Sequence, residues 1–185
     1  TNAATILDKF CLENAGEGAD WRIVVLGRKL PAATRNLFPR ITLAMAWPLI
    51  FRWEFDEAEE TLHSCRLRLD EIVQSGDMPA HEIRDLENLI LHREMMLGLF
   101  RNDAARAEKL CCGLIDGYTE ARPLVKASLF ITLLQIHRDT YNLRDADALA
   151  ARAKKLLDRS VHPRAIIPLD AAVADVRLMR GMDDH

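Results

Sequence analysis

Glycine, proline and long hydrophobic runs are scarce in this sequence. Its 185 residues include only 8 Gly and 7 Pro, too few for a β-sandwich or β-barrel, in which turns recur every ~10 residues. No run approaches the ~18 apolar residues of a membrane span, and no signal-peptide pattern opens the chain. These absences argue against all-β and membrane-spanning classes. We expect a cytoplasmic helical protein whose two ends are those of a fragment of a larger one.

Clusters of like charge and metal-binding cysteine spacings are also missing. The net charge is −3, and no basic stripe typical of a nucleic-acid module is present. Cys11, Cys65, Cys111 and Cys112 show no CxxC spacing, which argues against a zinc site or a disulfide scaffold. Because the adjacent pair at 111 and 112 falls in a helical pattern, at least one of these thiols should be buried. Buried reduced thiols are favoured over a redox switch.

Motifs of catalysis are absent as well. The sequence contains no GxxxxGK[ST] phosphate-binding loop, no HExxH metal motif, no recognisable nucleophile motif and no helix-turn-helix signature. We therefore expect no enzymatic activity, no cofactor and no bound metal.

Helical periodicity dominates the residues that are present. Apolar spacing and stop signals predict helices at about 3–15, 20–30, 32–38, 40–53, 56–74, 80–100, 103–115, 124–141, 143–159 and 164–180. The stretch RIVVL in the second segment could form a strand, but no partner strand lies nearby in the sequence. The connections are only a few residues long, which favours antiparallel neighbours.

Three junctions between these helices share one organisation. They are FRWEFDEAEETL, LFRNDAARAEKL and TYNLRDADALAARA, and aligning Ala58, Ala107 and Ala146 gives intervals of 49 and 39 residues. The intervals exceed the ~34 residues of a strict tetratricopeptide repeat, which variable linkers would explain. Alanine early in a second helix lets paired helices approach closely. The predicted fold is an all-α, tetratricopeptide-like, right-handed solenoid of antiparallel helix pairs.

The predicted solenoid is a single domain over residues 1–185. Residues 1–38 would form N-terminal capping helices, and residues 39–185 would form the stacked pairs.

The stretch FPRITLAMAWPLIFRWEFDEAEETL contains the main anomaly of the sequence, Pro48, which disfavours a helix interior by ~3 kcal/mol. Three interpretations are open: a kinked helix, an aromatic binding patch, or two elements split after Trp47. We favour one helix hairpin that begins at Pro39, packs Trp47 in its apolar seam and bends between Ala44 and Pro48. The aromatic-patch interpretation then keeps support only at Trp53.

Several short motifs occur in order along the chain: Leu30-Pro31, Pro39-Arg40, Ala46-Trp47, and Glu57-Ala58-Glu59 with Leu62. This combination resembles the central helical-repeat region of the large MalT-type (LAL) regulators of the LuxR family, over roughly residues 20–160. Two departures stand out. Pro48 follows the tryptophan where the family usually has Ala or Leu, and Glu54, Asn102 and Asn142 occupy turns where the family commonly has Gly.

The resemblance implies a sensor and relay domain. Its repeats would receive a small-molecule inducer or a protein partner and thereby alter self-association. ATP and DNA binding would belong to domains absent from this chain.

Candidate contacts are polar or aromatic residues on the first helix of each putative pair, which lines the concave face in tetratricopeptide-like solenoids. They are Arg52, Trp53, His92, Arg93, Gln135, His137 and Arg138. Most polar residues on such helices are merely solvated. A freestanding scaffold that binds peptides or proteins is the alternative function, and nothing in the sequence favours a helical enzyme.

Overall fold

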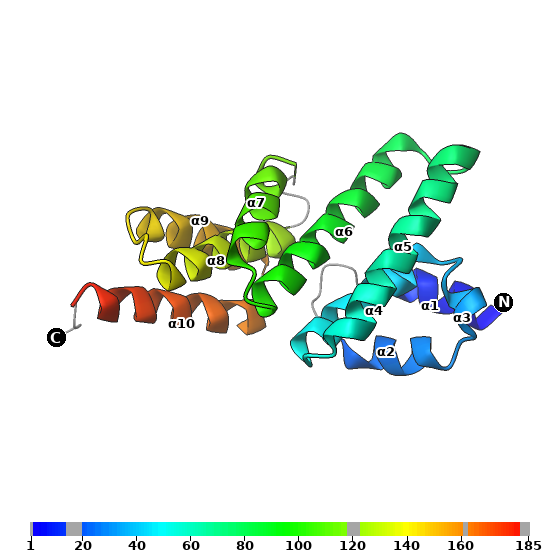
Figure 1. Ribbon diagram of the computed structural model, residues 1–185, viewed down its shortest axis with the longest axis horizontal. Coiled ribbons are helices and arrows are strands. Elements are labelled where there is room, and N and C mark those ends of the chain that lie inside the picture. Colours follow the sequence, from blue (N-terminus) through cyan, green and yellow to red (C-terminus); the bar gives the residue numbers. More distant parts are fainter. Residues whose placement is uncertain (1, 14–19, 118–122, 161–162, 182–185) are drawn as a thin grey trace. The chain divides into compact units, whose positions relative to one another are not determined.

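Every regular element in the described part of the chain is an α-helix (Figure 1). The computed structural model describes residues 2–13, 20–117, 123–160 and 163–181. The helices are α1 (Asn2–Glu13), α2 (Trp21–Arg28), α3 (Ala32–Arg35), α4 (Pro39–Phe51), α5 (Phe55–Ser75), α6 (Ala80–Phe100), α7 (Ala104–Ile115), α8 (Pro123–Asp139), α9 (Ala146–Ser160) and α10 (Pro163–Met179). The predicted all-α class is confirmed, and RIVVL lies inside α2 as predicted.

The chain divides into two compact units. Unit 1 spans Thr1–Asp103 and contains α1 to α6, and unit 2 spans Ala104–His185 and contains α7 to α10. Within each unit, helices that are neighbours in the sequence pack together, as expected for helical repeats. The right-handed stacking and the single repeat domain stay predictions. No helix among the described residues combines the length and apolar composition required to cross a lipid bilayer.

Unit 1 is built around α4, which contacts α1, α2, α3, α5 and α6. Residues on every side of α4 are buried, among them Ile41, Met45, Leu49 and Ile50. Each large apolar side chain buried in this way contributes about 1.5–3 kcal/mol. Gly27 of α2 lets α2 and α4 approach closely, because a Cβ at this position would lie 2.3 Å from Met45 Sδ of α4.

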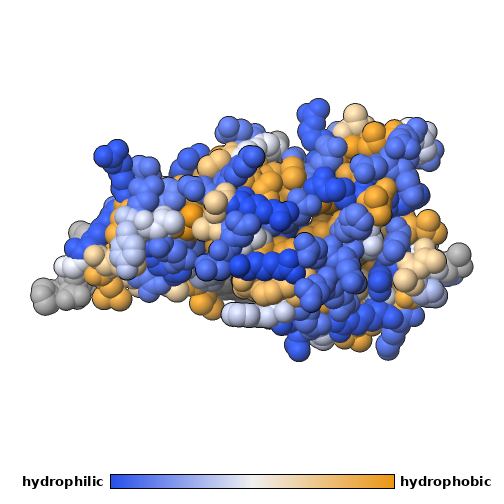
Figure 2. Space-filling model, in the orientation of Figure 1, coloured by the Kyte–Doolittle hydropathy of each residue, from blue (hydrophilic) through white to orange (hydrophobic). Residues whose placement is uncertain are grey.

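Unit 2 is built around α8, which packs against α7, α9 and α10. Its buried residues include Leu129, Phe130, Leu134 and Ile136. Of the surrounding helices, α7 and α9 are amphipathic, whereas α10 also exposes apolar side chains, among them Ile167 and Leu178. On the face drawn in Figure 2, hydrophilic side chains predominate and hydrophobic residues show between them.

Three helices end in the same turn. In α4, the Trp53 amide donates to the Ile50 carbonyl (3.1 Å) and the Glu54 amide to the Leu49 carbonyl (3.0 Å). These two bonds form a Schellman motif, which satisfies carbonyls that the helix end leaves open. The central residue is left-handed, with φ of 66° at Trp53.

The ends of α6 and α8 repeat this pattern. There the amides of Asp103 and Asn142 donate to the carbonyls of Gly98 and His137, each at 2.8 Å. The left-handed residues are Asn102 (φ 63°) and Tyr141 (φ 57°).

A buried alanine follows each turn at the same distance. Ala58, Ala107 and Ala146 each lie five residues after the left-handed residue and are at most 1% exposed. The alanine alignment made from the sequence therefore has a structural counterpart. Among the turn positions at which the family commonly has glycine, Asn102 is left-handed, whereas in the other two turns the left-handed residue is one position before Glu54 and Asn142.

Pro48 lies inside α4, and the helix continues through it to Phe51. The interpretation that splits the chain after Trp47 is therefore wrong. The Pro48 carbonyl still accepts a hydrogen bond from the Arg52 amide at 3.1 Å. Trp47 is only 6% exposed, which confirms its predicted role in packing. The bend between Ala44 and Pro48 stays a prediction.

Candidate interaction surface

A group of aromatic side chains, two of them exposed and two half-buried, surrounds the turn between α4 and α5 in unit 1. We call it the aromatic surface, and it consists of Phe51, Trp53, Phe55 and Phe100. Trp53 is 71% exposed and Phe51 is 46% exposed. The rings of Trp53 and Phe55 stack with centroids 6.0 Å apart, and Phe51 meets Phe100 edge-to-face at 5.1 Å. Aromatic residues that remain in water are typical of binding surfaces rather than of cores.

The backbone of the turn directs Trp53 outward. A left-handed conformation costs an L-residue about 1–2 kcal/mol relative to glycine, and bulky residues rarely adopt it. The stacking contact with Phe55 offsets part of this cost. Trp53 thus occupies a position where glycine would be more stable, and its side chain is held in the solvent.

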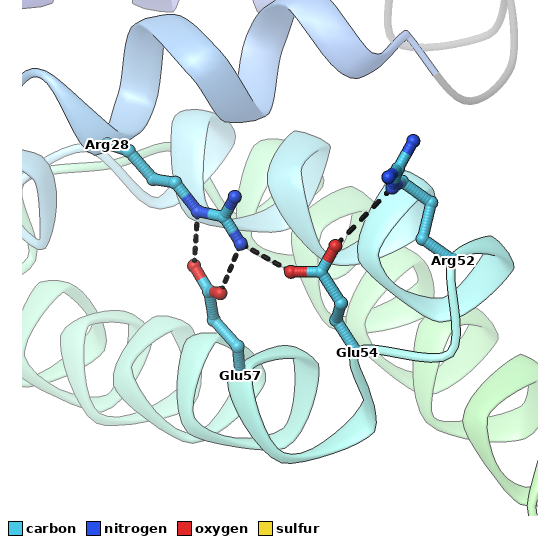
Figure 3. Close-up of polar contacts among 4 residues, drawn as sticks. All are labelled: Arg28, Arg52, Glu54 and Glu57. Atoms are coloured by element: carbon cyan, nitrogen blue, oxygen red, sulfur yellow. Dashed lines mark hydrogen bonds and ion pairs between the residues drawn. The ribbon is translucent and has the colours of Figure 1, made fainter.

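Four charged residues beside the turn form a chain of contacts, which Figure 3 shows. Arg28 of α2 donates from Nε to Glu57 Oε1 at 3.1 Å, and its Nη2 donates to both Glu57 and Glu54. Glu54 in turn accepts a 3.4 Å hydrogen bond from Arg52 Nε. The hydrogen bond from Arg28 is the main cause of the lowered pKa of Glu57. This network joins α2 to the hairpin of α4 and α5.

Arginines also stack on the aromatic rings of this region. The guanidinium carbon of Arg52 lies 4.3 Å from the centroid of the Trp21 ring. On the other side, Arg101 lies 5.8 Å from the Phe55 ring and pairs with Glu59 at 2.7 Å. Trp and Arg are the residues most often found at the energetic centres of protein interfaces. An aromatic centre with a charged border has the composition of such an interface.

His92 and Arg93 lie elsewhere in unit 1, on the buried side of α6. His92 is fully buried and Arg93 is 3% exposed. The Arg93 guanidinium carbon lies 3.5 Å from the centroid of the Trp47 ring, and Arg93 Nη1 lies 2.6 Å from His92 Nδ1. Burial, followed by the charge of Arg93, lowers the pKa of His92. These two candidates thus take part in the packing between α4 and α6.

The remaining candidates lie on α8 in unit 2. Gln135 is half-buried, and His137 Nε2 lies 3.5 Å from Glu108 Oε1 of α7. Arg138 Nη1 donates to Asp175 of α10 at 2.7 Å. His137 and Arg138 therefore link α8 to its neighbours within unit 2.

Of the seven candidates, the structure brings only some together. Trp53 belongs to the aromatic surface and Arg52 to the charges that border it, and His92 contacts Arg93 in the buried cluster. Sequence reasoning missed the partners of Trp53 on the aromatic surface, and it missed Trp21, Arg28 and Arg101. One signal was available, because aromatic residues alternate in FRWEF at positions 51, 53 and 55. The contributions of α2 and α6 carry no such local signal.

The described residues offer binding chemistry rather than coordination chemistry. Among them, no group of three or more His, Cys, Asp or Glu side chains is placed to hold a metal ion. Cys11, Cys65 and Cys111 are buried and Cys112 is exposed, which confirms the expectation for the adjacent pair. Burial raises the pKa of the Cys65 thiol to about 11.

Comparison with known proteins identifies no relative: no family model, no curated protein and no solved structure matches the chain.

Proposed function

We propose that this chain is the ligand-sensing and protein-interaction repeat domain of a MalT-type regulator of the LuxR family, with a tetratricopeptide-like right-handed solenoid fold. The observation that carries the proposal is the threefold turn. A left-handed residue followed five positions later by a buried alanine occurs at Trp53, Asn102 and Tyr141. The family assignment is based on the ordered motifs quoted above.

A relay function follows from the nature of repeats. Small rotations between repeats add up along a solenoid, so an inducer that contacts neighbouring repeats stabilises one curvature over another. That difference in affinity is what shifts the population of states. ATP and DNA would be bound by other domains of the parent protein, and this chain would be cytoplasmic, non-catalytic and capable of self-association.

A thermal-shift screen tests the sensing role. Sugars, nucleosides, aromatic acids and other small metabolites are added to the purified chain, because a ligand that binds only the folded state raises the melting temperature. We expect at least one class to raise it in a concentration-dependent manner. A uniformly flat screen would contradict the sensing role.

The regulator assignment has a separate test in the parent reading frame. We expect that frame to encode a nucleotide-binding domain and a helix-turn-helix domain as well. A parent protein without both would remove the regulator assignment and leave the repeat domain itself in place.

A freestanding scaffold for peptide or protein partners is the second candidate, and the aromatic surface favours it. Truncating an exposed aromatic residue at an interface centre commonly costs 2 kcal/mol or more of binding energy, about a 30-fold loss of affinity. We expect Trp53→Ala to abolish capture of a specific partner from extracts of the native host. Tyr141→Ala is the matched control, because Tyr141 is an equally exposed aromatic residue in the same type of turn. Equal capture by both variants would place binding outside the aromatic surface.

A further inference from the structure

An open groove runs between α9 and α10 in unit 2. Its volume is about 610 Å³, and both helices also pack on α8. The buried residues of α9 that face the interior include Leu149, Ala153 and Leu156. The groove is lined instead by an adjacent stripe of each helix.

The lining follows helical spacing on both walls. On α9 it runs from Asp147 through Ala150 and Ala151 to Lys154, and on α10 from Asp170 through positions 173 and 174 to 177. Seven residues of α-helix extend about 10 Å, so each wall is two helical turns long. A pair of parallel ridges of this length accommodates a third helix between them.

The apolar lining, which we call the floor, combines small side chains with the buried Leu169 of α10. Ala150 and Ala151 come from one wall and Ala174 from the other, and Val173 and Leu178 add apolar surface. Alanine at these positions lets the backbone of a helix approach closely. A small molecule would fit less well, because ligand pockets normally enclose most of the ligand, whereas Ala151, Ala174 and Leu178 are exposed.

The charges of the groove select the occupant. Asp147 is already paired with Arg180 at 2.6 Å, and Arg177, a second charged residue of the α10 wall, has an interaction partner of its own. Lys154 on the α9 wall and Asp170 on the α10 wall make no ion pair with any described residue. The groove therefore presents an available cation on one side of an apolar floor and an available anion on the other.

We propose that this groove binds an amphipathic helix of a partner protein. The helix places its apolar stripe on the alanines, an acidic residue toward Lys154 and a basic residue toward Asp170. Helix-in-groove recognition uses this arrangement, with apolar anchors at helical spacing and charges that fix orientation. The inference rests on the proposed role of the chain as a protein-interaction domain, and it adds a second surface and the chemistry of its partner.

The test is selection from a displayed library of helical peptides of about 14 residues, roughly four turns. The peptides share an Ala/Leu stripe and carry random residues on both flanks, and the full chain is the target. Selected peptides should carry Asp or Glu on one flank and Lys or Arg on the other. Ala151→Trp and Ala174→Trp fill the groove and should each weaken binding at least about tenfold, or 1.4 kcal/mol.

Matched controls are available on the same helices. Ala148→Trp and Ala171→Trp introduce the same side chain at exposed positions that do not line the groove, and they should leave affinity unchanged. Lys154→Glu should weaken binding about tenfold, and a peptide with a basic residue in place of its acid should restore it. Lys155→Glu, at the neighbouring exposed position, should have no effect.

Three results would overturn the proposal. No helical peptide is selected; the selected peptides bind Ala151→Trp as well as the parent chain; or sedimentation shows a dimer that Ala151→Trp dissociates, in which case a second copy occupies the groove. If only Trp53→Ala abolishes binding of the selected peptides, the groove is not their binding site, but the proposed interaction function is retained. That function fails separately, if neither the thermal-shift screen nor partner capture gives a hit.

Discussion

Each unit contains a helix hairpin, α4 with α5 in unit 1 and α8 with α9 in unit 2, and an arginine from outside the hairpin contacts its turn. That arginine comes before the hairpin in unit 1 and after it in unit 2. In unit 1, Arg28 of α2 reaches Glu54 and Glu57 beside the turn from α4 to α5. In unit 2, Arg180, just after α10, donates to the Leu143 carbonyl and pairs with Asp147 beside the turn from α8 to α9.

The comparison separates what is repeated from what is variable. The hairpin recurs in detail, with an apolar first helix, a left-handed aromatic residue and a buried alanine five residues later. The third helix differs in position along the chain, but in each unit an arginine in or just after it pairs with an acidic residue in the first turn of the hairpin's second helix. A cation is favoured there because the carboxylates of Glu57 and Asp147 accept charge-assisted hydrogen bonds from the guanidinium groups.

The buried alanines provide the strongest test of this equivalence. Ala58→Leu and Ala146→Leu should each destabilise the chain by about 2–3 kcal/mol, because extra atoms between packed helices force the helices apart. Urea unfolding measures the effect, and Ala148→Leu at an exposed position of α9 is the control. A loss of unfolding free energy below about 0.5 kcal/mol at either alanine would show that the two hairpins are not equivalent.

Protonation should distinguish the units, because fully buried His92 belongs to unit 1. Its pKa is lower in the folded state than in the unfolded state, mainly through burial, so the unfolded chain binds the proton first. The stability due to neutral His92 is fully present above about pH 6.5 and is lost as the pH falls below that value. The loss is about 1.4 kcal/mol per pH unit.

Hydrogen exchange in unit 1 at pH 7.5 and 5.5 measures this loss. His92→Gln should remove the pH dependence, whereas His63→Gln, at an exposed position of α5, should keep it. If the stability of His92→Gln depends on pH as that of the parent chain does, titratable groups other than His92 cause the loss of stability at low pH.

Glycine substitutions in the turns should stabilise the protein. Tyr141→Gly and Trp53→Gly relieve the left-handed strain, with an expected gain of about 0.5–1 kcal/mol each. The gain should be larger at position 141, because Trp53 also loses its contact with Phe55. Asn102→Gly should gain least, since asparagine tolerates this conformation. Thermal unfolding gives the order, and a reversed order would show that side-chain contacts outweigh backbone strain in these turns.

Removing the arginines should have the smallest effect. Arg28→Ala and Arg180→Ala should each cost about 0.5–1 kcal/mol, because partly exposed ion pairs are weak, and the cost should shrink as salt is added. Denaturation at low and high ionic strength measures both. A cost that is independent of salt would assign these side chains a packing role instead.

The helices were largely predictable because their apolar residues are periodic. The predicted segment 56–74 is α5 (Phe55–Ser75), and the segment 143–159 is α9, which begins three residues later at Ala146. The alanine alignment was also visible, because it depends on local sequence. The left-handed residues were not, since nothing in the sequence indicates that Trp53 and Tyr141 adopt a conformation that glycine prefers.

The candidate site was harder to predict. Polarity alone suggested that His92 and Arg93 face a ligand, but Arg93 is held against Trp47 by a contact between α4 and α6. Such contacts depend on packing between helices far apart in the sequence. The same holds for the stacking of Arg52 on Trp21, which joins the ends of two helices.

The distribution of tryptophan and cysteine gives each unit its own spectroscopic reporter. Trp21, Trp47 and Trp53 all belong to unit 1, so fluorescence excited selectively at tryptophan follows that unit alone. In unit 2, Cys112 is the exposed thiol among the four cysteines of the chain, and a maleimide dye should attach there without mutagenesis. After labelling at Cys112, the protein with its own sequence unchanged can therefore report on its two units at separate wavelengths.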